Sequence, residues 1–257
     1  MADALTDRAF WENYWRSKTG LDETIPADHT FYQQLGRIVR DEKVKTAIEI
    51  GGFPGYYAVY LQKFLGVKTA LFDFFIDEEI IAKLLTKNLL SENSVPVIEG
   101  DLFRYAPVEK YDLVLSCGLI EHFEDTEGVI REHLKFLKPG GSLFITLPNF
   151  RSVNGWVQKR FDRHNFDKHN LASMDPEKLR RIAGKLGLQE VKAGYFGRFS
   201  VWLEDKRNKK SGVKTAVRLI WILGKIITRI LPVETKMMSP YIVFEARLPL
   251  SAPEALA

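Results

Sequence analysis

The sequence has very little cysteine, little net charge and no apolar leader. A single cysteine, Cys117, excludes a disulfide within the chain and a zinc site built from several cysteines. Residues 1–18 contain no apolar stretch after a basic start, so we expect no signal peptide and a cytoplasmic protein. The 37 Lys and Arg residues against 33 Asp and Glu residues give a net charge of +4, which is too small to indicate a nucleic-acid partner.

Two phosphate-binding motifs are missing as well. A dinucleotide loop, G-x-G-x-x-G, needs three glycines after its strand, and these positions hold Gly51, Phe53 and Tyr56. The pattern G-x-x-x-x-G-K-[ST] does not occur either. Glu49 ends the preceding apolar run, and a carboxylate there repels a pyrophosphate but attracts a cation. The loop favours a ligand with an ammonium group and no phosphate, whereas an isolated Glu would be explained as a backbone cap.

What the sequence does contain is a regular alternation of strands and helices. Expected strands are 45–50, 68–74, 95–103, 111–117, 141–149, 188–197 and 241–249, and expected helices include 56–66, 77–90, 126–141 and 175–187. This alternation predicts an α/β fold with a doubly wound, mostly parallel sheet of seven strands. We expect one domain, 1–257, with an N-terminal helical cap at 1–40, a cofactor-binding core at 45–150 and an amphipathic basic insertion at 198–240 between strands six and seven.

Acidic residues end three successive predicted strands. Because ligands bind outside the carboxyl ends of such strands, Glu49, Asp73 and Asp101 should face one crevice. Asp73 can accept hydrogen bonds from ribose hydroxyls, and Asp101 from an exocyclic amine. Phe74 and Leu102 can enclose an adenine ring. Each residue alone is better explained as a turn or cap, but together they predict an adenosine with a cationic tail.

These motifs resemble class I S-adenosylmethionine-dependent methyltransferases. The resemblance is carried by IEIGGFPG (48–55), Asp73, EGDLF (99–103), YDLVLSCGLIEHF (111–123) and LKFLKPGGSLFITLPN (134–149). It implies a Rossmann-like methyltransferase fold and S-adenosyl-L-methionine as cofactor. The implied cofactor-binding residues are Tyr14, Glu49, Gly51, Gly52, Gly55, Asp73, Phe74, Asp101, Leu102, Ser116 and Cys117. Phe53 departs from the pattern, because the family usually has its middle glycine there, and Gly52 and Pro54 are expected to reshape the turn.

Two histidines are candidates for a catalytic base. For an alcohol or phenol acceptor, a neutral imidazole near the methyl group is a natural proton acceptor. The histidines considered are His122, and His164 and His169 in a polar loop expected to overhang the site; we select His122 and His169. His133 is interpreted as a surface residue of a helix. We therefore predict an O-methyltransferase. Transfer to nitrogen or carbon, or a non-catalytic adaptor with this fold, remains an alternative, and the acceptor and the oligomeric state stay open.

The stretch GLIEH also resembles the ubiquinone-pathway O-methyltransferases, whose version reads E-x-x-E-H and is associated with a divalent metal. Here the first acidic position is Gly118. Glu121 and His122 alone make a poor site for a hard cation, which prefers six or more oxygen ligands. The sequence therefore predicts no metal.

The segment 205–232 is basic and apolar. At about 100° per residue, its Lys and Arg residues fall on one narrow stripe beside a wide apolar arc. This pattern is typical of a helix lying in an anionic membrane surface. A helix packed on the sheet, a lid over the pocket or a dimer contact would explain it equally well. If the helix meets a membrane, the protein is membrane-associated and its acceptor is lipid-linked.

Overall fold

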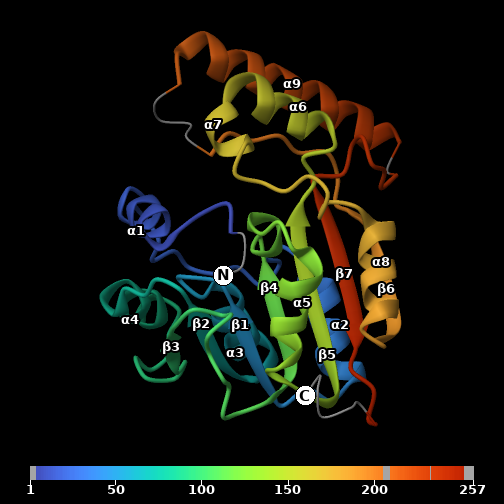
Figure 1. Cartoon of the computed structure of the whole chain (residues 1–257). Helices are drawn as coiled ribbons and strands as arrows, with labels where there is room; N and C mark the ends of the chain where they lie inside the picture. Colours follow the sequence, from blue (N-terminus) through green and yellow to red (C-terminus); the bar gives the residue numbers. More distant parts are fainter. Residues whose placement is uncertain (1–3, 205–208, 232, 252–257) are drawn as a thin grey trace.

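Seven apolar runs pair into one sheet in a computed structural model, which describes residues 4–204, 209–231 and 233–251 (Figure 1). The strands are β1 (Thr46–Ile50), β2 (Lys68–Asp73), β3 (Val97–Glu99), β4 (Tyr111–Cys117), β5 (Leu137–Pro148), β6 (Gln189–Phe196) and β7 (Tyr241–Arg247). Their order is β3-β2-β1-β4-β5-β7-β6, with β7 antiparallel to both neighbours and the other pairs parallel. The predicted fold class is confirmed.

Helices cover both faces of the sheet. They are α1 (Arg8–Arg16), α2 (Tyr32–Asp41), α3 (Tyr56–Leu65), α4 (Glu78–Lys87), the 3-10 helix η1 (Ile120–His122), α5 (Thr126–Leu134), α6 (Val153–Phe161), α7 (Arg163–Phe166), α8 (Pro176–Lys185) and α9 (Ser211–Ile230). Alternate residues of each strand point to opposite faces. Ile48 therefore packs in one core with α5 and α8, and Ala47 in the other with α2, α3 and α4.

A third apolar cluster lies beyond the carboxyl ends of the strands. It joins Val157 of α6, Phe199 and Val201 of the chain after β6, and Val217 of α9. In Figure 1, α6, α7 and α9 form a layer above the sheet, on the side where β4 and β5 end. We call this layer the helical cap; it is distinct from the N-terminal segment 1–40 that the sequence predicts as a cap. The helix α9 lies between β6 and β7, where the insertion was expected, while residues 205–208 and 232 of the predicted segment lie outside the described residues.

The segment 126–141, expected as a helix closed by Lys138-Pro139-Gly140-Gly141, holds a shorter helix than predicted. α5 ends at Leu134, and Leu137 already pairs with Tyr111 of β4, so residues 138–141 belong to β5. Pro139 cannot continue a helix.

The side chain of Lys138 forms an ion pair with Asp112, with 2.7 Å between the ammonium nitrogen and Oδ1. Although burial alone would raise the pKa of Asp112, this ammonium and the N–H groups of residues 45 and 46 outweigh it and lower the pKa to about 2.

Candidate active site

The strand order reverses between β1 and β4, which is where ligands bind in doubly wound sheets. The loop after β1 is shaped by glycines. Gly51 has a φ of 65°, and a Cβ atom on it would lie 2.6 Å from Leu119. A Cβ atom on Gly52 would lie 2.2 Å from Oε1 of Glu49. Any side chain at these positions would therefore fill the space between the loop, the carboxylate of Glu49 and the chain after β4.

Phe53 does not block this loop, because its side chain turns into the core. It is 2% exposed and packs edge-to-face on Trp15 of α1 and on Phe75, with ring centroids 5.3 Å away in each case. Its backbone N–H donates to Oδ2 of Asp73 at 2.9 Å. The residue that replaces the family's middle glycine thus joins the first loop, the second strand and α1.

Three acidic side chains lie at or just after the carboxyl ends of β1, β2 and β3. Glu49 accepts a hydrogen bond from the N–H of Ala58 at 2.7 Å, and burial raises its pKa to about 8. Asp73 accepts from the N–H groups of Phe53 and Phe75, and burial raises its pKa to about 6. Asp101 is more exposed and accepts from the N–H of Phe103 at 3.0 Å. All three carboxylates thus also hold backbone N–H groups around the cavity.

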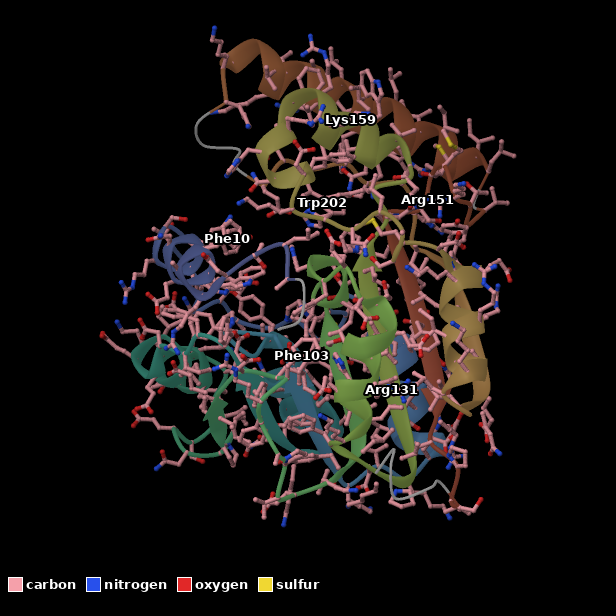
Figure 2. All side chains as sticks on the ribbon, in the orientation of Figure 1. Phe10, Phe103, Arg131, Arg151, Lys159 and Trp202 are labelled. Carbon is pink, nitrogen blue, oxygen red and sulfur yellow. The ribbon has the colours of Figure 1, made fainter. Side chains whose placement is uncertain are left out.

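These residues line a cavity of about 950 Å³ that is closed on one side by α1. The predicted residues on its wall are Tyr14, Glu49, Gly51, Gly52, Asp73, Phe74, Asp101, Leu102, Cys117, His122 and His169. In Figure 2, Phe10 on α1, Phe103 after β3 and Trp202 below the helical cap mark three sides of it. A buried carboxylate beside two bare glycines, with aromatic rings around them, fits a cationic adenosine cofactor. This cavity is where we expect such a cofactor to bind.

Two predicted residues do not line the cavity. Gly55 begins α3 with a φ of 101°, and its Cα hydrogens face Leu71 in the core. Ser116 lies on the opposite face of β4 from the cavity, and its hydroxyl donates to Nε2 of His133 at 2.9 Å. His133 is fully buried and donates from Nδ1 to the carbonyl of Val129, so its interpretation as a surface residue is wrong.

The candidate catalytic histidines lie side by side at one end of the cavity. Their ring centroids are 4.6 Å apart. Nδ1 of His122 donates to the carbonyl of Lys168 at 3.0 Å, and Nδ1 of His169 donates to that of Asn165 at 2.8 Å. Each ring thus keeps the lone pair of Nε2 available. Burial lowers both pKa values, to about 3 for His122, so both imidazoles are neutral at pH 7.

Glu121 completes this group. It is 1% exposed, its Oε2 has no hydrogen-bond partner among the described residues, and burial raises its pKa to about 8. Ligand atoms of Glu121, His122 and His169 lie within 4.8 Å of one another, a set that could hold a metal ion. The sequence-based expectation of no metal considered only the first two, because His169 is distant in the chain.

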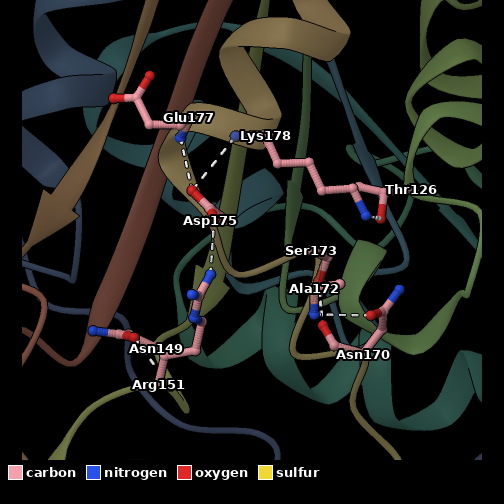
Figure 3. Close-up of polar contacts among 9 residues, drawn as sticks. All are labelled: Thr126, Asn149, Arg151, Asn170, Ala172, Ser173, Asp175, Glu177 and Lys178. Atoms are coloured by element: carbon pink, nitrogen blue, oxygen red, sulfur yellow. Dashed lines mark hydrogen bonds and ion pairs between the residues drawn. The ribbon is translucent and has the colours of Figure 1, made fainter.

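The chain that carries His169 is fastened to η1 by its neighbour. Asn170 donates its backbone N–H to the carbonyl of Glu121 at 2.7 Å and its side-chain amide to that of Phe123 at 2.9 Å. Figure 3 shows how the same loop is held further along, where Arg151 pairs with Asp175 at the start of α8. These contacts fix the loop over the sheet and so bring His169 to His122.

Sequence reasoning missed several lining residues. Trp11 packs edge-to-face on His122, with the ring centroids 4.9 Å apart. Glu204, after β6, accepts from the hydroxyl of Tyr14 at 3.1 Å and from the indole N–H of Trp202 at 2.8 Å. The many aromatic residues of α1 could have indicated that Trp11 lines the cavity. Trp202 and Glu204 belong to no motif, so only the folded chain could reveal them.

Comparison with known proteins identifies the family. A family described as methyltransferase domain matches residues 28–193. Malonyl-[acyl-carrier protein] O-methyltransferase 2 of Ilyobacter polytropus is 27% identical over 136 residues, which are 52% of this chain and 51% of that protein. The chain thus spans about half the length of this curated relative.

Two solved structures share the fold at low identity. Phosphoethanolamine N-methyltransferase 2 of Haemonchus contortus, with S-adenosyl-L-methionine, has a TM-score of 0.56 at 17% identity, covering 85% of this chain and 53% of that one. The N-methyltransferase NodS of Bradyrhizobium japonicum, with S-adenosyl-L-homocysteine, has a TM-score of 0.55 at 16% identity, covering 93% and 98%. With the family match over most of the chain, the protein belongs to the class I S-adenosylmethionine-dependent methyltransferases.

Proposed function

We propose that this protein transfers a methyl group from S-adenosylmethionine to an oxygen atom of a small-molecule or lipid-linked acceptor. The observation that carries the proposal is the pair of neutral imidazoles, His122 and His169, whose Nε2 atoms have no hydrogen-bond partner on the described chain and whose side chains line the cavity. A hydroxyl acceptor has a proton to lose, and such a lone pair can take it.

The cofactor supplies an electrophilic methyl group on a positively charged sulfur. The chain supplies position and a place for one proton. Glu49 and the bare Cα atoms of Gly51 and Gly52 suit the cationic end of the cofactor. Nε2 of His122 or His169 takes the proton of the acceptor. Burial disfavours the imidazolium so formed, and the neighbouring Glu121 offsets this cost when it is ionised.

The wall of the cavity favours an apolar or aromatic acceptor. Trp11, Phe123, Phe150 and Trp202 line the end that holds the histidines. The similarity to an O-methyltransferase of a carrier-linked substrate supports an acceptor attached to a larger carrier. We further propose an anionic membrane surface as a partner of the segment 205–232, which would present a lipid-linked acceptor.

An amine acceptor is the second candidate. The carboxyl group of Glu204 contacts the side chains of Tyr14 and Trp202, and Glu121 lines the same cavity; such a group of carboxyls and rings can hold an ammonium ion. The two solved structures named above are N-methyltransferases, which agrees with this alternative.

Methyl transfer from labelled S-adenosylmethionine to matched phenols, carboxylic acids and amines tests the proposal. We expect labelled O-methyl products, and a fall in kcat of about 10²-fold or more in His122→Gln or His169→Gln. His164→Gln is the matched control, because His164 is exposed and outside the cavity. Labelled amines alone, or an unchanged kcat in both cavity variants, would overturn the assignment to oxygen.

A further inference from the structure

The helix α9 is fixed to the rest of the helical cap by one narrow face. Val217, Gly224 and Thr228 are buried on that face. A Cβ atom on Gly224 would lie 2.0 Å from the ring of Phe199, so this ring rests directly on the helix backbone. Stepping about 100° per residue places the three buried residues within one narrow arc. The opposite side of the helix therefore faces away from the cap.

That opposite side is apolar and exposed. Leu219, Leu223, Ile226 and Ile230 are between 53% and 74% exposed. Most of the exposed large apolar side chains of the described chain lie in α9 or just after it, namely Leu219, Trp221, Ile222, Leu223, Ile226, Ile227, Ile230, Leu231, Val233 and Met237. An exposed apolar patch of this kind marks a surface that meets another molecule or a membrane.

Basic residues border this apolar arc along one edge. Lys214, Arg218, Lys225 and Arg229 follow one another along a single line of the helix. Residues 211–231 contain no Asp or Glu, so nothing within the helix itself balances this charge. The neighbouring α6 adds the exposed side chains of Trp156, Lys159 and Arg160, and Figure 2 labels Lys159 beside α9. We call the outer side of α9 with these basic residues the α9 face.

We infer that the α9 face seats α9 in the plane of an anionic lipid surface. This inference rests on the proposed function, because it specifies how the chain meets the membrane that would present its acceptor. The apolar arc enters the boundary between headgroups and acyl chains, and the Lys and Arg side chains reach the lipid phosphates. None of the described helices is long and apolar enough to cross a membrane.

The charge pattern favours lipid over a second copy of this chain. Two α9 faces brought together would place basic residues near basic residues, and no carboxylate in residues 211–231 would offset the repulsion. Anionic phosphates neutralise the same residues. The ammonium of Lys225 lies 5.4 Å from the centroid of the Trp221 ring, and stepping about 100° per residue places this ring on the buried side of the basic line, away from the apolar arc.

Flotation of the full chain with vesicles of phosphatidylcholine, with and without phosphatidylglycerol, tests the inference. At low salt we expect the protein to float with the anionic vesicles and to be released by salt. Because each basic residue at such a surface contributes about fivefold to partitioning, Arg218→Glu with Lys225→Glu should reduce it at least about 25-fold. Leu223→Ser with Ile226→Ser should reduce it even at low salt.

Matched controls are Lys68→Glu and Val108→Ser, which change an exposed cation and an exposed apolar residue far from α9. Both should float like the wild type. Methyl transfer to a water-soluble acceptor should be retained in all these variants, so a failure of docking is distinguishable from a failure of the proposed function. Absence of flotation, equal binding to neutral vesicles, or a dimer in sedimentation that Leu223→Ser with Ile226→Ser dissociates would overturn the inference.

Discussion

Glu49 should couple cofactor binding to the release of a proton. In the free protein, burial raises the pKa of this carboxyl to about 8. A cationic ligand beside it favours the ionised form and lowers that pKa. The complex therefore holds fewer protons than the free protein, and affinity must rise with pH below about 8. About a tenth of the free protein is ionised at Glu49 at pH 7 and about a hundredth at pH 6, so affinity should rise about tenfold between them, or about 1.4 kcal/mol.

Calorimetric titration of S-adenosylmethionine at pH 7 in two buffers with different ionisation enthalpies measures this release. We expect nearly one proton per cofactor bound. Glu49→Gln is the matched control, because its amide oxygen can still accept from the N–H of Ala58 but carries no titratable proton. Subtracting the proton release measured with the variant also removes the contribution of the cofactor's own amino group. Equal proton release by both proteins, or a wild-type affinity that is constant from pH 6 to 8, would refute the reasoning.

Three further predictions concern stability. Gly224→Ala gains about 1 kcal/mol of helix propensity but forces a Cβ atom into Phe199, at a cost of about 1–3 kcal/mol. Urea denaturation should therefore show a lower free energy of unfolding. The control Gly212→Ala, which has open space around it, should raise the free energy of unfolding by up to about 1 kcal/mol. Phe53→Gly removes a buried ring and should lower the free energy of unfolding by about 3 kcal/mol or more in the same assay. Because the pKa of Asp112 is lowered in the folded protein, its contribution to the free energy of unfolding is present above pH 4 and is lost as pH falls towards 2. Asp112→Asn should therefore make the free energy of unfolding less dependent on pH over that range. An unchanged acid-unfolding profile would contradict the pairing with Lys138.

The central sheet could be predicted because its signals are local. The strands β1 to β4 are short apolar runs that stop at a glycine or an acidic residue, as at Gly51 and Asp73, and such runs report their burial directly. From the strand ends, the sequence also indicated that the acidic residues would face one crevice. Glu49, Asp73 and Asp101 all line the cavity. The grouping was predictable because it depends only on the topology of the sheet.

Other features could not be predicted from the sequence, or were predicted wrongly. The approach of His169 to Glu121 depends on how a long connection folds back, which Asn170 decides through contacts with chain far away in sequence. His133 was misjudged although the sequence held a signal, because it lies four residues after Val129 on the apolar face of α5. The side of β4 that carries Ser116 could likewise have been assigned by alternation from Cys117, which lines the cavity.

The aromatic contact between Phe53 and Trp15 has a consequence for how this site can change over time. The cofactor loop and α1 share one pair of rings, so substitutions in the two segments are not independent. A glycine at position 53 would remove one of the two aromatic rings on which Trp15 packs. A compensating change in α1 should therefore recover part of the stability lost on that substitution. For the same reason, replacing α1 by that of a relative whose loop carries glycine at this point should lower stability.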